Sequence, residues 1–124
     1  GRSKIVGLPL TNMLIEKGAT VTCCNSTTPS TWYYTRNADY AFSAVGVPNY
    51  FDFSDFTNLC ELIVDIGINR DEDGKLCGDV NNVGFENSLN DTFVTPVPGG
   101  VGLLTRLALM QNVVDAYKVQ KMKG

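Results

Sequence analysis

The chain opens with residues that could bind an anion. Residues 1–9 read Gly-Arg-Ser-Lys-Ile-Val-Gly-Leu-Pro and lead directly into an amphipathic segment. A glycine turn ahead of a helix offers backbone N–H groups to a phosphate, and the helix dipole favours the negative charge there. The guanidinium of Arg2 could add a bidentate phosphate contact. Because the spacing does not match Gly-x-Gly-x-x-Gly, a tight turn with exposed charges is an equally open interpretation.

A second candidate is the polar stretch that follows the β-rich residues 19–24. Positions 25–28 read Asn-Ser-Thr-Thr and hold no carboxylate. In NAD-selective sites of dinucleotide-binding folds, an Asp or Glu near this strand end binds the ribose 2′-OH. Without that charge a 2′-phosphate is not repelled, so the hydroxyls of Ser26 and Thr27, with Arg2 nearby, favour NADP. An ordinary polar turn would have the same composition.

A third candidate is the segment 96–102, which reads Pro-Val-Pro-Gly-Gly-Val-Gly. Three glycines and two prolines ahead of a long helix form a rigid wall with few side chains. Such a wall lets a flat ligand approach the backbone closely. The alternative is a connector between a strand and a helix, although a connector seldom needs so many special residues.

These segments lie between alternating strand and helix patterns. Apolar periodicity and stop signals predict helices over 8–17, 31–36 and 101–119, strands over 19–24, 40–45, 62–66 and 92–95, an extended piece over 75–80, and helical turns over 53–56 and 84–89. One face of the last helix is expected to be buried, since apolar residues recur there at spacings of three and four: Leu104, Leu107, Met110, Val114 and Tyr117. The continuous apolar run over 62–66 favours a strand covered on both faces, as in a parallel sheet.

The alternation predicts an α/β fold in a single domain covering residues 1–124. We expect a Rossmann-like dinucleotide-binding domain with a mostly parallel sheet and flanking helices. A phosphate-binding turn hangs from the end of a strand, and no strand precedes Gly1 in this sequence. We therefore expect that the first strand of the fold is missing from the sequence as given.

Composition narrows the function. Ten basic and 13 acidic residues give a net charge of −3, which disfavours a nucleic-acid partner. The apolar runs fall short of the ~20 residues that span a bilayer, so no membrane partner is expected. The sequence has no histidine, which excludes Ser-His and Cys-His catalysis and His-based metal sites. The four cysteines lack a zinc spacing and are expected to be reduced, mostly buried thiols of a cytoplasmic or mitochondrial protein.

Several motifs occur together in a fixed order. They are Gly1-Arg2-Ser3-x-x-Val6-Gly7-x-Pro9, Ala19-Thr20-Val21-Thr22, Ala38-Asp39, Val64-Asp65-Ile66-Gly67-Ile68-Asn69, Gly78-Asp79-Val80 and Thr95-Pro96-Val97-Pro98-Gly99-Gly100-Val101-Gly102. Over essentially the whole chain, this set resembles the C-terminal half of the bifunctional methylenetetrahydrofolate dehydrogenase/methenyltetrahydrofolate cyclohydrolase family.

The resemblance implies NADP-dependent oxidation of 5,10-methylenetetrahydrofolate and hydrolysis of the methenyl product to 10-formyltetrahydrofolate. The residues it implies for cofactor binding are Gly1, Arg2, Ser3, Ser26 and Ile68, and those for lining the folate cleft are Pro98, Gly99, Gly100, Val101 and Gly102. The family's catalytic lysine lies in an N-terminal domain, so no catalytic residue and no metal site is expected here. That domain, a tetrahydrofolate derivative and a second copy in a full-length homodimer are the implied partners.

Some positions depart from the family pattern. Asn25 stands where His is common, Leu103 and Leu104 replace Pro-Met, and Arg106 lies in a helical turn that is normally apolar. The run from Tyr117 to Lys121 matches Tyr-x-x-x-Lys, the motif that holds the family's catalytic lysine. A sequence of this composition is expected to contain roughly a quarter of one such match by chance, so we assign the run no catalytic role. The alternatives to the family function are a non-catalytic nucleotide-binding fragment and another Rossmann oxidoreductase, such as one resembling shikimate dehydrogenase.

Overall fold

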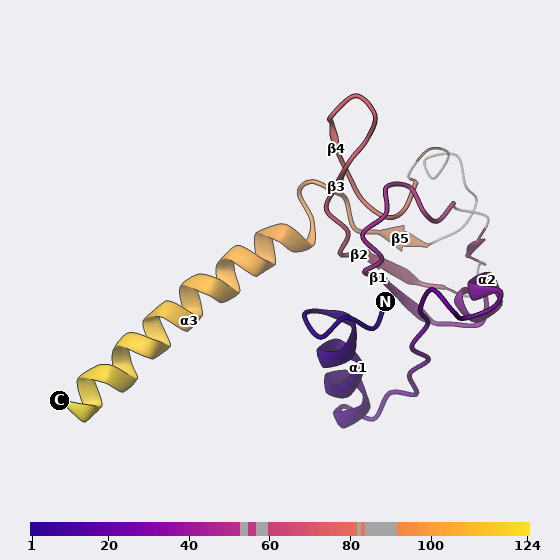
Figure 1. The fold of residues 1–124 in the computed structure, drawn as a ribbon. Coiled ribbons are helices and arrows are strands. Elements are labelled where there is room, and N and C mark those ends of the chain that lie inside the picture. Colours follow the sequence, from indigo (N-terminus) through magenta and orange to yellow (C-terminus); the bar gives the residue numbers. More distant parts are fainter. Residues whose placement is uncertain (53–54, 57–59, 82, 84–91) are drawn as a thin grey trace.

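The computed structural model describes residues 1–52, 55–56, 60–81, 83 and 92–124. They form a small body built on a β-sheet, from which one long helix extends (Figure 1). The amino terminus lies beside the sheet, and the carboxyl terminus lies at the far end of the long helix.

A parallel three-stranded sheet is the centre of the body. Its strands are β1 (Tyr40–Ser43), β2 (Leu62–Asp65) and β5 (Phe93–Val94), in the order β1-β2-β5. Tyr40 pairs with Leu62 and Leu62 with Phe93, both in parallel register. The core forms around β2, where Ile63 is fully buried among Phe56, Cys60 and Val80. The predicted Rossmann-like class and the central, apolar β2 are confirmed.

The first helix forms where the sequence predicts it. Helix α1 covers Gly7–Glu16, and Pro9 lies in its first turn, where the missing N–H costs no helical hydrogen bond. Lys17 is its C-cap, and the next residue, Gly18, has a φ of 87°, in the left-handed region that glycine adopts just after helix ends. Helix α2 covers Thr31–Thr35, close to its predicted bounds.

The strand predicted over residues 19–24 does not form. A β-strand exists through its hydrogen bonds to a neighbour, and β1 is the outer strand of the sheet on its side. No strand among the described residues pairs with 19–24, so its β-rich composition is not sufficient.

The charged turn after β2 is a β-hairpin that the sequence did not predict as such. Strands β3 (Asn69–Arg70) and β4 (Leu76–Cys77) pair in antiparallel fashion. Between them, Asp71 Oδ1 accepts the backbone N–H groups of Asp73 and Lys75, which fixes the turn. Of the helical turns predicted over 53–56 and 84–89, the second lies outside the described residues and the first is described only at 55–56.

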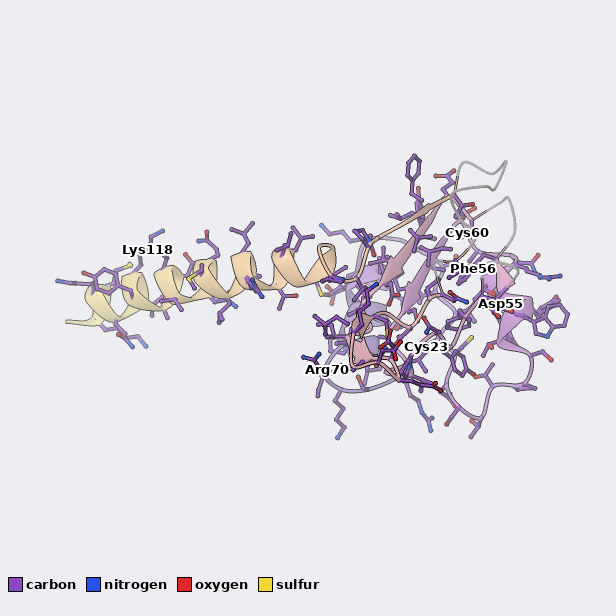
Figure 2. All side chains as sticks on the ribbon, turned by 90° about the horizontal axis from the view of Figure 1, so that it is seen from above. Cys23, Asp55, Phe56, Cys60, Arg70 and Lys118 are labelled. Carbon is purple, nitrogen blue, oxygen red and sulfur yellow. The ribbon has the colours of Figure 1, made fainter. Side chains whose placement is uncertain are left out.

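The last helix, α3, covers Val101–Lys123 and exceeds its predicted length by one turn. The expectation that one of its faces is buried is wrong: Leu104 and Leu107 are 65% and 67% exposed, and Met110, Val114 and Tyr117 are exposed too. The reason is visible in two views, where α3 leaves the body and Lys118 lies far from Phe56 and Cys60 (Figures 1 and 2). No helix among the described residues is long and apolar enough to cross a membrane.

The four cysteines are free thiols, as predicted. Only Cys60 is buried, whereas Cys23 is exposed and the other two are half-buried, so the expected burial holds for one position.

The core around β2 should dominate stability. We expect Ile63→Ala to lower the free energy of unfolding by about 2–5 kcal/mol, because it removes buried methyl groups and leaves a cavity. The matched control is Ile5→Ala, whose side chain is 88% exposed and should matter by less than about 0.5 kcal/mol. Urea unfolding followed by circular dichroism measures both, and equal effects would show that the core lies elsewhere.

Candidate functional site

The opening turn packs against the carboxyl end of β1. A Cβ built at Gly1 would overlap the carbonyl oxygen of Ala44, the residue that follows β1. A Cβ built at Gly7 would overlap the carbonyl oxygen of Gly1. The thiol of Cys23 lies 3.8 Å from that same oxygen. Both glycines are therefore needed for the turn to fold back on itself beside the strand end.

The turn also closes onto the first turn of α1. The Ser3 carbonyl accepts the N–H of Leu8 at 2.9 Å, and Ser3 Oγ accepts the N–H of Val6 at 3.3 Å. No acidic side chain lies in the first turn of the helix, and no side chain caps it. Arg2 is exposed and makes no hydrogen bond or ion pair with the described part of the chain. An unpaired guanidinium thus stands beside a helix start that attracts negative charge.

The polar stretch forms a compact turn that presents Ser26. Asn25 Oδ1 accepts both the N–H of Thr27 at 2.9 Å and its hydroxyl at 2.6 Å, and the Thr28 N–H donates to the Asn25 carbonyl. Ser26 is exposed, and its hydroxyl has no hydrogen-bond partner among the described residues. Of the two hydroxyls that the sequence offers as donors, only that of Ser26 is free, since the Thr27 proton is used within the turn.

Ile68 lies at the carboxyl end of β2. It sits between Gly67 and Asn69 and is 69% exposed. An apolar side chain of this size at a strand end offers a flat contact to a ligand that lies across the edge of the sheet. The structure therefore places Ile68 at the same edge as Ala44 and the opening turn, because β1 and β2 run parallel.

The segment 96–102 follows β5 and forms the tight turn that starts α3. Thr95 attaches it to β2: its N–H donates to the Ile63 carbonyl at 3.0 Å, and its Oγ1 accepts the Asp65 N–H at 2.9 Å. The Val97–Pro98 peptide is cis, and Gly99 has a φ of 101°. A Cβ at Gly100 would overlap the Pro96 carbonyl oxygen. Of the predicted residues, 98–100 therefore lie in a tight turn at the carboxyl end of β5, and 101–102 begin α3.

Two buried aspartates organise the strand ends, and the sequence reasoning assigned no role to either. Asp79 is fully buried, and its carboxylate accepts five hydrogen bonds. The donors to Oδ2 are the Ser43 hydroxyl (2.9 Å) and the Val45 N–H (2.6 Å), and those to Oδ1 are the Gly46 N–H (3.1 Å), the Val47 N–H (3.2 Å) and Asn69 Nδ2 (2.9 Å). The strand was predicted to reach residue 45, but β1 ends at Ser43, and the Val45 N–H donates to this carboxylate instead of to a neighbouring strand.

Asp65, the last residue of β2, binds the backbone around Asp79. Its Oδ1 accepts the N–H groups of Gly67 (3.0 Å) and Asp79 (3.1 Å), and its Oδ2 accepts that of Val80 (2.9 Å). Burial raises the pKa of Asp65; the backbone hydrogen bonds lower it in part, and the nearby Asp79 raises it further. A sequence signal existed for both residues: each is an acid in an apolar stretch with a glycine within two positions, Asp65-Ile66-Gly67 and Gly78-Asp79.

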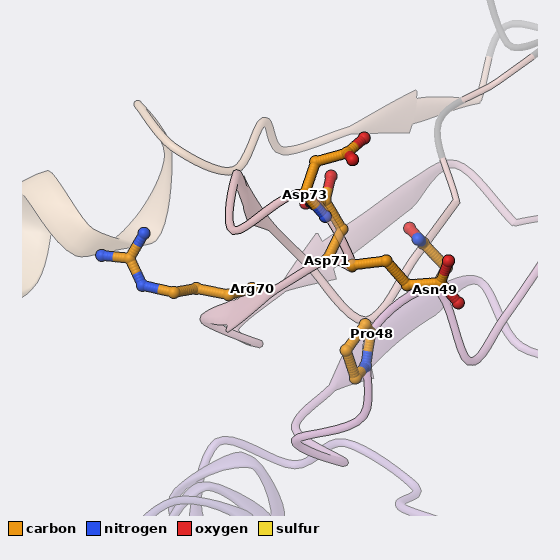
Figure 3. Close-up of a pocket in the computed structure, with 6 residues that line it drawn as sticks. Pro48, Asn49, Arg70, Asp71 and Asp73 are labelled. Carbon is orange, nitrogen blue, oxygen red and sulfur yellow. Dashed lines mark hydrogen bonds between the residues drawn. The ribbon is translucent and has the colours of Figure 1, made fainter.

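An open hollow near the hairpin lies apart from the predicted cofactor-binding residues. It lies between the loop after β1 and the hairpin, and the residues that line it are Pro48, Asn49, Arg70, Asp71, Glu72 and Asp73 (Figure 3). Arg70 points away from the carboxylate of Asp73 and donates to the Gly74 carbonyl at 2.6 Å. None of the predicted site residues lines this hollow, so it is not the candidate cofactor site.

The raised pKa of Asp65 fixes the sign of a pH dependence. Above its ordinary value of 3.8 and up to its folded-state value, the folded protein holds the proton more tightly than the unfolded chain. The contribution of this group to stability is therefore present below about pH 4 and lost as pH rises through the folded-state pKa.

Asp65→Asn removes this titration. We expect the free energy of unfolding of the unsubstituted protein, relative to that of Asp65→Asn, to fall as pH rises from about 4. Urea unfolding of both proteins over a pH series measures the difference. A difference that grows with pH would contradict the raised pKa.

Comparison with known sequences finds a match over nearly the whole chain. Residues 1–121 match the family described as tetrahydrofolate dehydrogenase/cyclohydrolase, NAD(P)-binding domain. The bifunctional protein FolD of Nitrosomonas europaea is 47% identical over 121 residues, which cover 98% of this chain and 40% of that protein. FolD of Paraburkholderia xenovorans is 45% identical over 94% of this chain and 40% of its own length. The chain thus spans about 40% of the length of these relatives.

Solved structures agree with the sequence matches. The bifunctional 5,10-methylenetetrahydrofolate dehydrogenase/cyclohydrolase of Thermoplasma acidophilum superposes with a TM-score of 0.85 at 36% identity, covering 98% of this chain and 43% of that one. The enzyme of Trypanosoma brucei, solved with NADP cofactor and an inhibitor, has a TM-score of 0.81 at 32% identity and covers 97% and 42%.

Proposed function

We propose a function from one premise: the chain belongs to the tetrahydrofolate dehydrogenase/cyclohydrolase family, as its NAD(P)-binding domain. Residues 1–124 supply the cofactor-binding part of an enzyme that oxidises 5,10-methylenetetrahydrofolate to 5,10-methenyltetrahydrofolate with NADP. The same enzyme hydrolyses the product to 10-formyltetrahydrofolate. The observation that carries this proposal is the opening turn, which packs on the β1 end beside a helix start that holds no acidic side chain, and in which Arg2 has no partner among the described residues.

The residues of the strand-end edge fit a dinucleotide phosphate. Gly1 and Gly7 pack directly against the Ala44 and Gly1 carbonyl oxygens, which only glycine allows, and neither residue adds a side chain that would cover the backbone of the turn. Arg2 supplies the positive charge, and the free hydroxyl of Ser26 supplies a donor for the 2′-phosphate that distinguishes NADP from NAD. Ile68 supplies an exposed apolar contact. The bound cofactor supplies the hydride acceptor.

The folate substrate would lie against residues 98–102, the turn after β5 and the start of α3. Their backbone carries little side-chain bulk, and Gly99 adopts a conformation that other residues rarely take. The proposed catalytic lysine belongs to the rest of the enzyme. The Tyr117 and Lys121 pair lies on exposed α3, with Lys121 Nζ 5.9 Å from the Tyr117 ring centroid, and we assign it no catalytic role.

The exposed face of α3 is the proposed contact with the N-terminal part of the enzyme. It carries Leu104, Leu107, Met110, Val114 and Tyr117, and nothing in the described chain covers it. The relatives have more than half of their length outside the matched part, which is enough chain to cover it. A homodimeric full-length enzyme in a cytoplasmic or mitochondrial compartment stays a prediction.

The test uses a hybrid protein in which residues 1–124 replace the matching part of the Nitrosomonas europaea relative, chosen for its 47% identity. We expect the hybrid to reduce NADP with 5,10-methylenetetrahydrofolate, and residues 1–124 alone to show neither activity. Arg2→Ala in the hybrid should weaken NADP binding by about tenfold or more, because a charge-assisted contact to phosphate is lost. Absorbance at the reduced-cofactor band and calorimetry measure the two results.

Arg70→Ala is the matched control for Arg2→Ala, since Arg70 is exposed and bonded within the hairpin. It should leave NADP affinity unchanged. A hybrid that binds NADP without oxidising folate would instead support the non-catalytic nucleotide-binding alternative. A hybrid without preference for NADP over NAD, and without loss on replacing Arg2, would refute the proposed cofactor site.

The contact through α3 has its own test in the hybrid. Leu107→Asp should lower the free energy of unfolding by about 2 kcal/mol or more, because it places a charge in the proposed apolar interface. Asn112→Asp is the control, since a rotation of 100° per residue puts it on the opposite side of the helix. Equal small effects of the two substitutions would mean that this face of α3 stays in water.

A further inference from the structure

We propose that Asp79 is a positioning residue for the cofactor site: its buried carboxylate holds the surface on which the opening turn rests and the loop that carries Ile68. This inference rests on the proposed function, because it assigns a role within the same site. Neither the sequence motifs nor the family description gives Asp79 this role.

The first link between Asp79 and the cofactor site is the end of β1 and the loop after it, residues 43–47. Four of the five hydrogen bonds to the Asp79 carboxylate come from residues 43–47. Ala44 lies inside this run, between Ser43 and Val45, which both donate to Oδ2. The Ala44 carbonyl oxygen is the atom that a Cβ at Gly1 would overlap. A shift of the 43–47 loop would therefore change the surface that meets the opening turn.

The second link between Asp79 and the cofactor site is the loop after β2, which carries Ile68. Asn69 Nδ2 donates to Asp79 Oδ1 at 2.9 Å. On the other side of Ile68, Gly67 lies so close to Asp79 that a Cβ there would overlap the carboxylate. Ile68 is thus held between two residues that both touch Asp79, although its own side chain is exposed.

Only a carboxylate suits this place. An ionised carboxylate is acceptor-only, so both oxygens can accept from surrounding N–H and O–H groups. An Asn side chain would turn an NH₂ group toward either the Val45 N–H or the N–H groups of Gly46 and Val47, leaving buried donors unpaired. Asp65 fixes the backbone of Asp79 itself, through the bond from the Asp79 N–H to its Oδ1.

The experiment compares Asp79→Asn with the unsubstituted hybrid protein. We expect the KM for NADP to rise by about tenfold or more, because the loop under the opening turn loses its anchor. The KM for the folate should change by less than about twofold. Residues 98–102, which we propose contact the folate, follow β5 in the chain and are not part of the loops that Asp79 binds. The control Asp71→Asn makes the same chemical change at a carboxylate that accepts two N–H groups in the hairpin, and should alter neither constant.

Hydrogen exchange gives a readout that does not depend on the cofactor. Asp79→Asn should speed exchange at residues 43–47 and also in the opening turn, residues 1–8, and at 67–69, while the thermal melt stays cooperative. Faster exchange confined to 43–47, with the opening turn unchanged, would overturn the proposal. The same holds if the KM values for NADP and folate rise together.

Ser43→Ala keeps the test decisive if Asp79→Asn does not fold. It removes one donor to Oδ2 and leaves no buried donor unpaired. It should raise the KM for NADP by about two- to fivefold and speed exchange in residues 1–8. Unchanged values in this variant would also overturn the proposal. Failure of the unsubstituted hybrid to bind NADP would refute the proposed function instead, and the exchange data would still decide the role of Asp79.

Discussion

The carboxylates of Asp65 and Asp79 are the interaction on which the strand-end edge of this domain depends. Together they accept eight hydrogen bonds, six of them from backbone N–H groups of the segments that follow β1, β2 and β4. A buried charge without such donors would cost several kcal/mol. Here the surrounding N–H and O–H donors stabilise the two buried carboxylates, and these hydrogen bonds in turn fix the loops that carry the donors.

The glycines beside these acids complete the arrangement. A side chain at Gly67 would collide with the carboxylate of Asp79, and one at Gly78 with that of Asp65. Each acid thus occupies the space left by a glycine near the other acid. This reciprocal fit explains why two distant parts of the sequence carry related glycine–acid spacings, and why β2 and the segment after β4 meet in a single geometry.

The sequence predicted the elements whose signals are local. The apolar run of β2, the stop at Gly18 and the glycine-rich turn before α3 each follow from backbone preferences or burial, and all three appear in the structure. Two predictions were wrong for the same reason: the strand over residues 19–24 and the buried face of α3. A strand and a buried apolar face both need a partner surface, and the periodicity of the sequence does not show whether one is present.

The site was predicted less completely than the fold. The motifs proposed Arg2, Ser26 and Ile68 as cofactor-binding residues, and within the described part of the chain the Arg2 side chain and the Ser26 hydroxyl have no partner. Which hydroxyl of the 25–28 turn is already used, and which acid supports the loops, depends on hydrogen bonds between distant residues. Such long-range contacts leave little trace in composition or spacing.

The way α3 joins the sheet has a mechanical consequence. At 1.5 Å per residue its 23 residues make a helix about 34 Å long, which the turn at 96–100 joins to β5. A rotation of about 10° at that hinge point would sweep the distal tip through roughly 6 Å. The backbone torsions of Gly99 and Gly100 therefore set the direction of α3. They also set where a protein surface bound along the helix would lie relative to the edge of the sheet.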